Sequence, residues 1–156
     1  MSAPYEEILS GESLWRLPPG SRHEIIAERL HARVALCAAA ITTARLLPLR
    51  SVVQICPGTL LRPDLTLVTA ATGKAWLIAE VVDTVDHHAD TVVKKTIYED
   101  VRLPRLWMVD PRYDNVEVYH GSPYGLALRR ILSHRDLLTE ALLPELSLGM
   151  AELFEG

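Results

Sequence analysis

The sequence predicts an α/β fold in which helices cover a mixed β-sheet. Two helical patterns, near residues 21–40 and 88–102, are separated by short β-like runs. The run at residues 75–82 is apolar on both faces, which is typical of a central strand that is covered on both sides. The order of helix, three strands, helix and strand therefore indicates a layered sheet with hairpins added at both ends.

The N-terminal region begins with an extended hairpin. Residues 5–17 are expected to turn at Ser10-Gly11, and Pro18-Pro19-Gly20 ends the hairpin. A helix follows to about Ala40, because apolar residues recur at helical intervals. Ser21 is a plausible N-cap, with Glu24 at the spacing of a capping box.

Strands dominate the middle of the chain. We expect them at residues 51–56, 65–68 and 75–82, with turns at Pro57-Gly58 and at residues 71–74. Three strands in succession suggest a meander. A second helix from about His88 to Arg102 ends before Pro104, and residues 106–109 form the next strand.

The last third of the chain is less regular. Residues 116–119 and 126–132 are expected to pair as an outer hairpin. Residues 137–154 contain short apolar turns around Pro144 and are interpreted as packing material.

Length and composition indicate a globular protein. The 156 residues match the usual size of one domain, so we expect a single domain over residues 1–156. A content of 49% hydrophobic and 23% charged residues is neither a disordered nor a membrane profile. No apolar stretch approaches the roughly 20 residues of a membrane-spanning helix, and Glu6 and Glu7 stand where a signal peptide would carry cations. We expect a cytoplasmic location and no membrane partner.

Charge and cysteine content narrow the functional classes. A net charge of −4 argues against avid, non-specific binding of nucleic acid. Cations flank residues 64–80 on both sides, so a local basic rim is compatible with DNA: Arg45, Arg50, Arg62, Lys94, Lys95, Arg102 and Arg105. Cys37 and Cys56 are expected to be buried thiols, and they form no zinc motif.

Two acids are the leading candidates for a metal site. Glu80 lies at the end of the apolar strand, where an ionised carboxylate needs a compensating partner. Asp64 opens the preceding strand, and paired strands lie about 5 Å apart, so both carboxylates can face one cleft. Such oxygen ligands suit hard cations like Mg²⁺. On the next helix, Asp90, Lys94 and Tyr98 share one stripe at spacings of four, which lets Lys94 reach the acids.

In this order and spacing, the residues resemble the Uma-type restriction endonuclease family, a bacterial group within the PD-(D/E)XK nuclease superfamily. The matching segments cover most of the chain: residues 5–12, Pro18-Pro19 with His23, Arg62-Pro63-Asp64, Glu80-Val81-Val82, the helix with Asp90, Lys94 and Tyr98, and residues 103–111. The resemblance implies a restriction-endonuclease-like, three-layer core. Its central mixed β-sheet would be flanked by helices and extended by N-terminal and C-terminal hairpins.

The resemblance also implies a function, an endonuclease that hydrolyses DNA with Mg²⁺ or Mn²⁺. The implied catalytic residues are Asp64, Glu80 and Lys94. The metal would be held by the two acids and the main-chain carbonyl of Val81. The implied supporting residues are His23, Asp90 and Tyr98.

The chain departs from the family pattern at two places. The superfamily lysine two residues after the acid is Val82 here, so Lys94 takes that role by resemblance, with Lys95 as a neighbouring candidate. The family usually continues with Ser-Pro-Ser after this point, whereas this chain has Asp83-Thr84-Val85. The second change leaves the acids intact but alters the loop beside them.

Interpretations without a metal remain open. Asp64 can be a turn or capping aspartate, Glu80 can be a buried acid paired only with Lys94, and Lys94 can be a solvated lysine. The acids and histidines at residues 86–90 are interpreted as a helix N-terminus, where acids favour the dipole, and not as metal ligands. The alternatives to an enzyme are a nuclease fold that binds DNA or protein without hydrolysis, and an accessory protein that forms a homodimer through the edge of the hairpin at residues 116–132.

Overall fold

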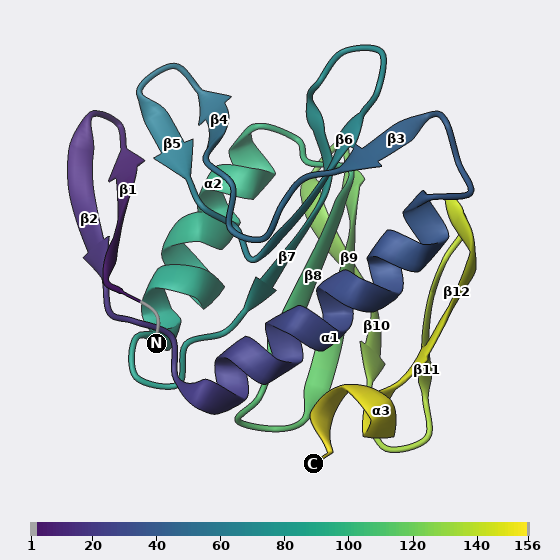
Figure 1. The fold of residues 1–156 in the computed structure, drawn as a ribbon. Coiled ribbons are helices and arrows are strands. Elements are labelled where there is room, and N and C mark those ends of the chain that lie inside the picture. Colours follow the sequence, from purple (N-terminus) through teal and green to yellow (C-terminus); the bar gives the residue numbers. More distant parts are fainter. Residues whose placement is uncertain (1–2, 156) are drawn as a thin grey trace.

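A six-stranded sheet forms the centre of the computed structural model, which describes residues 3–155 (Figure 1). The strand order is β10-β9-β8-β7-β6-β3. The strands are β3 (Ala44–Leu46), β6 (Leu65–Thr69), β7 (Ala75–Val81), β8 (Arg105–Asp110), β9 (Asn115–Ser122) and β10 (Gly125–Leu132). β7 and β8 are parallel and the other neighbours are antiparallel, so the sheet is mixed, as predicted.

Helices cover both faces of this sheet. α1 (Ser21–Ala38) packs on one face, where alternate β7 residues such as Leu77 and Ala79 point. The π-helix η1 (Ala89–Lys94) continues into α2 (Lys95–Asp100) on the other side, where Tyr98 packs with Ile78. This arrangement of helix, sheet and helix confirms the predicted three-layer fold.

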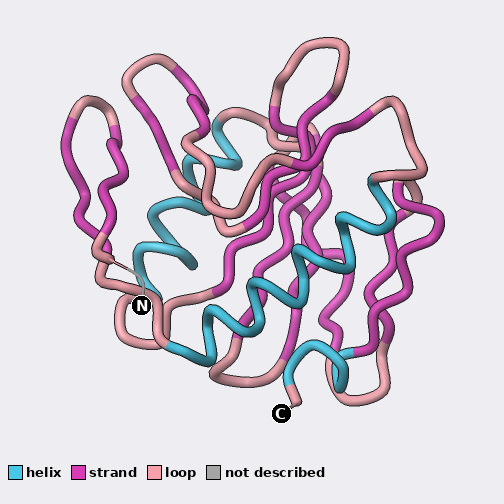
Figure 2. The backbone as a smooth tube through the Cα atoms, viewed as in Figure 1, coloured by secondary structure: helices cyan, strands magenta, loops and turns pink. Residues whose placement is uncertain are grey.

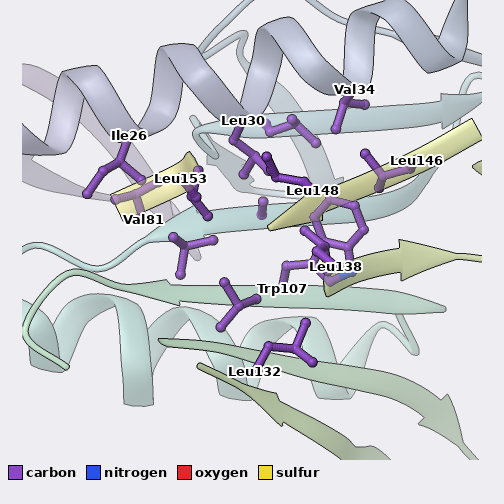
Figure 3. Close-up of a cluster of buried hydrophobic side chains, with 14 of the residues drawn as sticks. Ile26, Leu30, Val34, Val81, Trp107, Leu132, Leu138, Leu146, Leu148 and Leu153 are labelled. Atoms are coloured by element: carbon purple, nitrogen blue, oxygen red, sulfur yellow. The ribbon is translucent and has the colours of Figure 1, made fainter. Parts of the chain in front are cut away.

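The larger core lies between α1 and the sheet (Figure 3). Ile26, Leu30 and Val34 recur every four residues along α1 and face Trp107 of β8 in the same cluster. The C-terminal elements close this core, because Leu148 and Leu153 are also buried in it. These elements are β11 (Leu137–Glu140), β12 (Leu143–Gly149) and α3 (Met150–Phe154), so the tail has more regular structure than the turns we expected.

A second sheet contains the N-terminal hairpin. It consists of β1 (Tyr5–Leu9), β2 (Glu12–Arg16), β4 (Val53–Cys56) and β5 (Thr59–Leu61), in the order β2-β1-β5-β4. The predicted turn at Ser10-Gly11 is present, and both residues have the positive φ of a type I′ hairpin turn, 50° and 82°. In Figure 2 the hairpin β1–β2 and the hairpin β4–β5 lie beside each other at one side of the central sheet.

The predicted meander is wrong. The strand at residues 53–56 pairs with β5 in the smaller sheet and not with β6. The cause is the turn at Pro57-Gly58, where Gly58 adopts φ +82° and returns the chain onto Thr59–Leu61. β6 instead pairs with β3 and β7. The prediction missed β3 and β5 because strands of three residues leave little periodicity to detect.

The helix ends also differ from expectation. The N-cap of α1 is Gly20 and makes no side-chain capping bond, so the predicted capping box at Ser21 is wrong. The Glu24 carboxylate instead accepts a hydrogen bond from the guanidinium group of Arg50. Both cysteines are free thiols, with Cys37 buried and Cys56 partly buried. Within residues 3–155, no helix is long and apolar enough to cross a membrane.

Candidate functional site

The structure brings Asp64 and Glu80 to the same end of two adjacent strands. Leu65 of β6 pairs with Ala79 of β7, so Asp64 and Glu80 are the next residues along this antiparallel register. Both side chains are buried, with residue exposures of 5% for Asp64 and 1% for Glu80. Their position gives the two carboxylates one shared environment at the C-terminal end of β7.

Asp64 is held by two donors on separate elements. Its Oδ2 accepts a hydrogen bond from the main-chain N–H of Val81 at 2.8 Å, and its Oδ1 accepts one from Nε of Arg50 at 3.0 Å. Burial opposes ionisation of Asp64, but His23, Arg50 and the Val81 N–H outweigh it and lower the pKa of the carboxyl group. Asp64 is therefore an ionised acid in a fixed orientation.

Arg50 has an unusual backbone for a non-glycine residue, with φ +53°. Its guanidinium group bonds Asp64 and also forms an ion pair with Glu24 of α1. The left-handed conformation is thus associated with a cation that links α1 to the acid.

His23 lies in the first turn of α1 and contacts the same strand end. Its Nε2 is 2.7 Å from the carbonyl oxygen of Val81, a distance at which an N–H donates to that oxygen, and 3.6 Å from Oδ2 of Asp64. Burial lowers the pKa of His23. Asp64 and the Val81 carbonyl raise it by more than burial lowers it, so the net shift of the pKa is upward. His23 is thus placed beside two of the three groups implied as metal ligands.

Glu80 is held by the helical side of the site. Its Oε2 accepts a hydrogen bond from the Tyr98 hydroxyl at 2.9 Å and forms an ion pair with the Lys94 ammonium group. Burial raises the pKa of Glu80 to about 8; Lys94 opposes this shift, while Asp90 and Asp64 add to it. Burial is therefore the main cause of the raised pKa of Glu80, and the neighbouring acids add to it.

The segment η1–α2 supplies both of these partners. Asp90 and Lys94 belong to the π-helix, and Tyr98 follows one turn later in α2. All three are buried, as the predicted stripe requires. π-Helical turns are frequent at functional sites. Lys95 points elsewhere, because it pairs with Glu99 and lies over the ring of Tyr119.

Two residues that the sequence reasoning missed complete the cluster. Glu7 of β1 accepts bonds from Lys94 Nζ at 2.8 Å and from Arg16 Nη1 at 2.9 Å. Arg16 of β2 also donates to both oxygens of Asp90, at 3.0 and 3.1 Å. Both side chains come from the N-terminal hairpin, far from Asp90 and Lys94 in the sequence. No spacing rule connects residues so far apart. The family resemblance covers residues 5–12 but assigned Glu7 no role, so the fold identifies both residues.

The loop after β7 forms a local turn where the resemblance implies Ser-Pro-Ser. The Asp83 carboxylate accepts the main-chain N–H groups of Val85 and Asp86, which closes an Asx-type turn. The N–H of Asp83 donates to Asp90, so the loop is also tied to η1. The altered sequence therefore still gives an anchored loop beside Glu80.

The donor chemistry at this strand end fits a hard divalent cation. Four buried carboxylates, those of Glu7, Asp64, Glu80 and Asp90, are matched by three permanent cations, Arg16, Arg50 and Lys94. Arg50 also forms an ion pair with Glu24, so its charge is shared between two acids. The carboxylates of Asp64 and Glu80 would hold such an ion with the Val81 carbonyl oxygen. Within the part of the chain that the structure describes, no group of three or more His, Cys, Asp or Glu side chains forms a metal cluster, so the carbonyl oxygen would have to complete the set.

A cavity of about 300 Å³ lies beside the site. His23 at the start of α1 and Val82 at the end of β7 are among its lining residues, together with Arg22 and Pro111. The cavity lies on the α1 side of the strand end and borders His23, which contacts the Val81 carbonyl, whereas Asp64, Glu80 and Lys94 do not line it.

Comparisons with known proteins agree with this architecture. No curated protein matches the chain. A solved structure, described as a putative nuclease belonging to DUF820 from Anabaena variabilis ATCC 29413, superposes with a TM-score of 0.80 over 97% of this chain and 90% of that chain, at 16% sequence identity. This similarity shows the fold. The family model Uma2, described as "Putative restriction endonuclease", matches residues 5–151, and the chain therefore belongs to the Uma2 family.

Proposed function

We propose that this protein is a metal-dependent endonuclease that hydrolyses phosphodiester bonds in DNA. The observation that carries the proposal is the convergence of Asp64 and Glu80 on adjacent strand ends, with the Lys94 ammonium group in contact with Glu80. Two carboxylates can hold a divalent ion, and an ammonium group can stabilise negative charge that develops on a phosphate. The family description supports a nuclease of this kind.

The two acids and a main-chain carbonyl would bind the metal ion, and Lys94 would act on the phosphate. Asp64, Glu80 and the Val81 carbonyl would hold Mg²⁺ or Mn²⁺, which polarises a phosphodiester oxygen and lowers the pKa of a bound water molecule. Lys94 stabilises negative charge that develops on the phosphate and orients the attacking water.

The neighbours of these residues keep them in place. Arg50 and the Val81 N–H fix Asp64. Tyr98 fixes Glu80, and His23 fixes the Val81 carbonyl group. Asp90 would support the site indirectly, because it accepts hydrogen bonds from Arg16 and from the main-chain N–H of Asp83 in the neighbouring loop.

Nicking of supercoiled plasmid DNA tests the proposal. The wild-type protein should nick plasmid with Mg²⁺ or Mn²⁺ and should lose this activity with EDTA. Asp64→Ala and the closer mimic Asp64→Asn should reduce nicking to background. A matched control is Glu140→Gln, because Glu140 is another buried acid but pairs with Arg105 outside the site. Equal nicking by the wild type and the Asp64 variants would refute the assignment.

A second candidate is a nuclease fold that binds DNA or protein without hydrolysis. It is favoured by one observation, that Lys94 and Arg50 already form ion pairs with Glu80 and Asp64. Calorimetric titration with Mn²⁺ separates the two candidates. Heat that Asp64→Asn abolishes supports the nuclease, and the absence of heat in the wild type supports the binding module.

A further inference from the structure

We propose that Glu7, in the N-terminal hairpin, is a positioning residue that holds Lys94 during hydrolysis and leaves Glu80 free to bind the metal ion. The inference rests on the proposed nuclease function and adds a residue to it. Glu7 touches neither of the proposed metal-binding carboxylates in any contact that the structure records among residues 3–155. Besides its direct electrostatic effect on Glu80, it would act on the site through Lys94.

Lys94 is buried in contact with two acids. Its ammonium group lies between two carboxylates and contacts Oε2 of Glu7, at 2.8 Å, and Oε2 of Glu80. The exposed fraction of the Lys94 side chain is 1% and that of Glu7 is 0%. A buried ammonium group without an anionic partner is strongly unfavourable. Lys94 therefore needs at least one of these two acids at all times.

Metal binding would weaken one of these contacts. Both recorded contacts of Glu80, with Tyr98 and with Lys94, are made by Oε2, so an ion could bind Oε1 and would then offset the negative charge that Glu80 offers to Lys94. Glu7 would then be the stronger anionic partner of Lys94. The Glu7 carboxylate would let the Lys94 ammonium group stay charged and buried while the Glu80 carboxylate binds the ion.

Glu7 is itself fixed by further bonds. Its Oε2 accepts the main-chain N–H of Arg62 at 2.7 Å, two residues before Asp64 in the sequence. Its Oε1 accepts Nη1 of Arg16 at 2.9 Å, and Arg16 is in turn bound to Asp90. One carboxylate thus connects the segment that carries Asp64 with the helix that carries Lys94. This is the geometry of a group that sets the distance between two parts of a site.

The decisive variant is Glu7→Gln, which keeps the size and an acceptor oxygen but removes the charge. Lys94 then depends on Glu80 alone and competes with the ion, so the Kd for Mn²⁺ by calorimetry should rise about tenfold. The kcat for plasmid nicking should fall while the KM for DNA stays unchanged. Glu140→Gln, the buried acid paired with Arg105, should change neither quantity.

A double-mutant cycle separates positioning from general structure. In a Lys94→Met background no ammonium group competes for Glu80, so adding Glu7→Gln should leave the Mn²⁺ Kd within about twofold. A second variant, Glu7→Asp, keeps the charge but retracts the carboxylate by one methylene. It should retain the Mn²⁺ Kd and lower kcat, and it provides the test if Glu7→Gln does not fold.

A wild-type Kd and kcat in Glu7→Gln, an equal rise in Kd with and without Lys94, or an unchanged kcat in Glu7→Asp would overturn the role of Glu7 and leave the nuclease proposal standing. Failure of the wild-type protein to bind Mn²⁺ would overturn the nuclease proposal, and the role of Glu7 with it.

Discussion

Tyr98 shows how a single side chain acts in both the core and the site. Its ring is buried with Ile78 and Val82, and its hydroxyl donates to Glu80 at 2.9 Å. Removing only the hydroxyl leaves a buried acceptor with one donor fewer, and the cost of such a loss is about 1–3 kcal/mol. Tyr98→Phe should therefore lower the free energy of unfolding by that amount in urea denaturation.

A second tyrosine serves as the control for this prediction. Tyr124 is 98% exposed, so Tyr124→Phe should change the free energy of unfolding by less than about 0.5 kcal/mol. If the two variants are equally stable, the bond from Tyr98 to Glu80 contributes nothing to folding.

At this scale the sequence predicted the residues that lie on periodic elements. The spacing of Asp90, Lys94 and Tyr98 placed all three on one stripe, and the structure buries all three. The sequence could not indicate Glu7, because its bond to Lys94 joins residues 87 positions apart. The same holds for Arg16 and Asp90, which are 74 positions apart.

Among the elements, the hairpin β1–β2 is tied to η1 by the buried ion pair between Arg16 and Asp90. Breaking such a pair leaves an uncompensated charge and typically costs about 3–5 kcal/mol. Arg16→Met should therefore destabilise the protein by this amount in equilibrium urea unfolding.

The matched control is a surface pair. Arg33 and Glu152 form an ion pair with side chains that are 35% and 59% exposed, so Arg33→Met should cost at most about 1 kcal/mol. A loss in Arg16→Met no larger than in Arg33→Met would show that the hairpin is not held by this contact.

The register of α1 gives a separate prediction. Leu30 is fully buried against the sheet, whereas Leu36 is 71% exposed. Leu30→Ala should cost about 2–5 kcal/mol because it leaves a cavity in the core, and Leu36→Ala should cost less than about 0.5 kcal/mol. Thermal or urea denaturation of both variants measures the difference, and a reversed order would mean that α1 presents its other face.

The elements also show where sequence reasoning ends. α1 was predicted from its helical apolar period, and β6 and β8 from short apolar runs between turn signals. β7 was correctly identified as covered on both faces because its run is apolar at both parities. The pairing of β4 was predicted wrongly, because strand order depends on contacts between distant segments and on the turn at Gly58. The start of the second helix as a π-helix left no mark in its apolar pattern.

At the scale of the whole molecule, two helical layers and a mixed sheet bring four separate segments to one strand end. The hairpin supplies Glu7 and Arg16, the residue just before β6 is Asp64, β7 supplies Glu80, and η1 supplies Lys94. The surplus of buried carboxylates over permanent cations is a property of this assembly, and no single segment carries it. A proton on Glu80, whose pKa burial raises to about 8, offsets this surplus, and the proposed function requires that a divalent cation can take its place.

An anomalous difference map from a crystal soaked in Mn²⁺ tests that claim most directly. The account predicts a peak in contact with the carboxylates of Asp64 and Glu80 and with the carbonyl oxygen of Val81, and no such peak in crystals of Asp64→Asn. A map from the wild-type protein without density at this strand end, under conditions in which the protein nicks DNA with Mn²⁺, would contradict it.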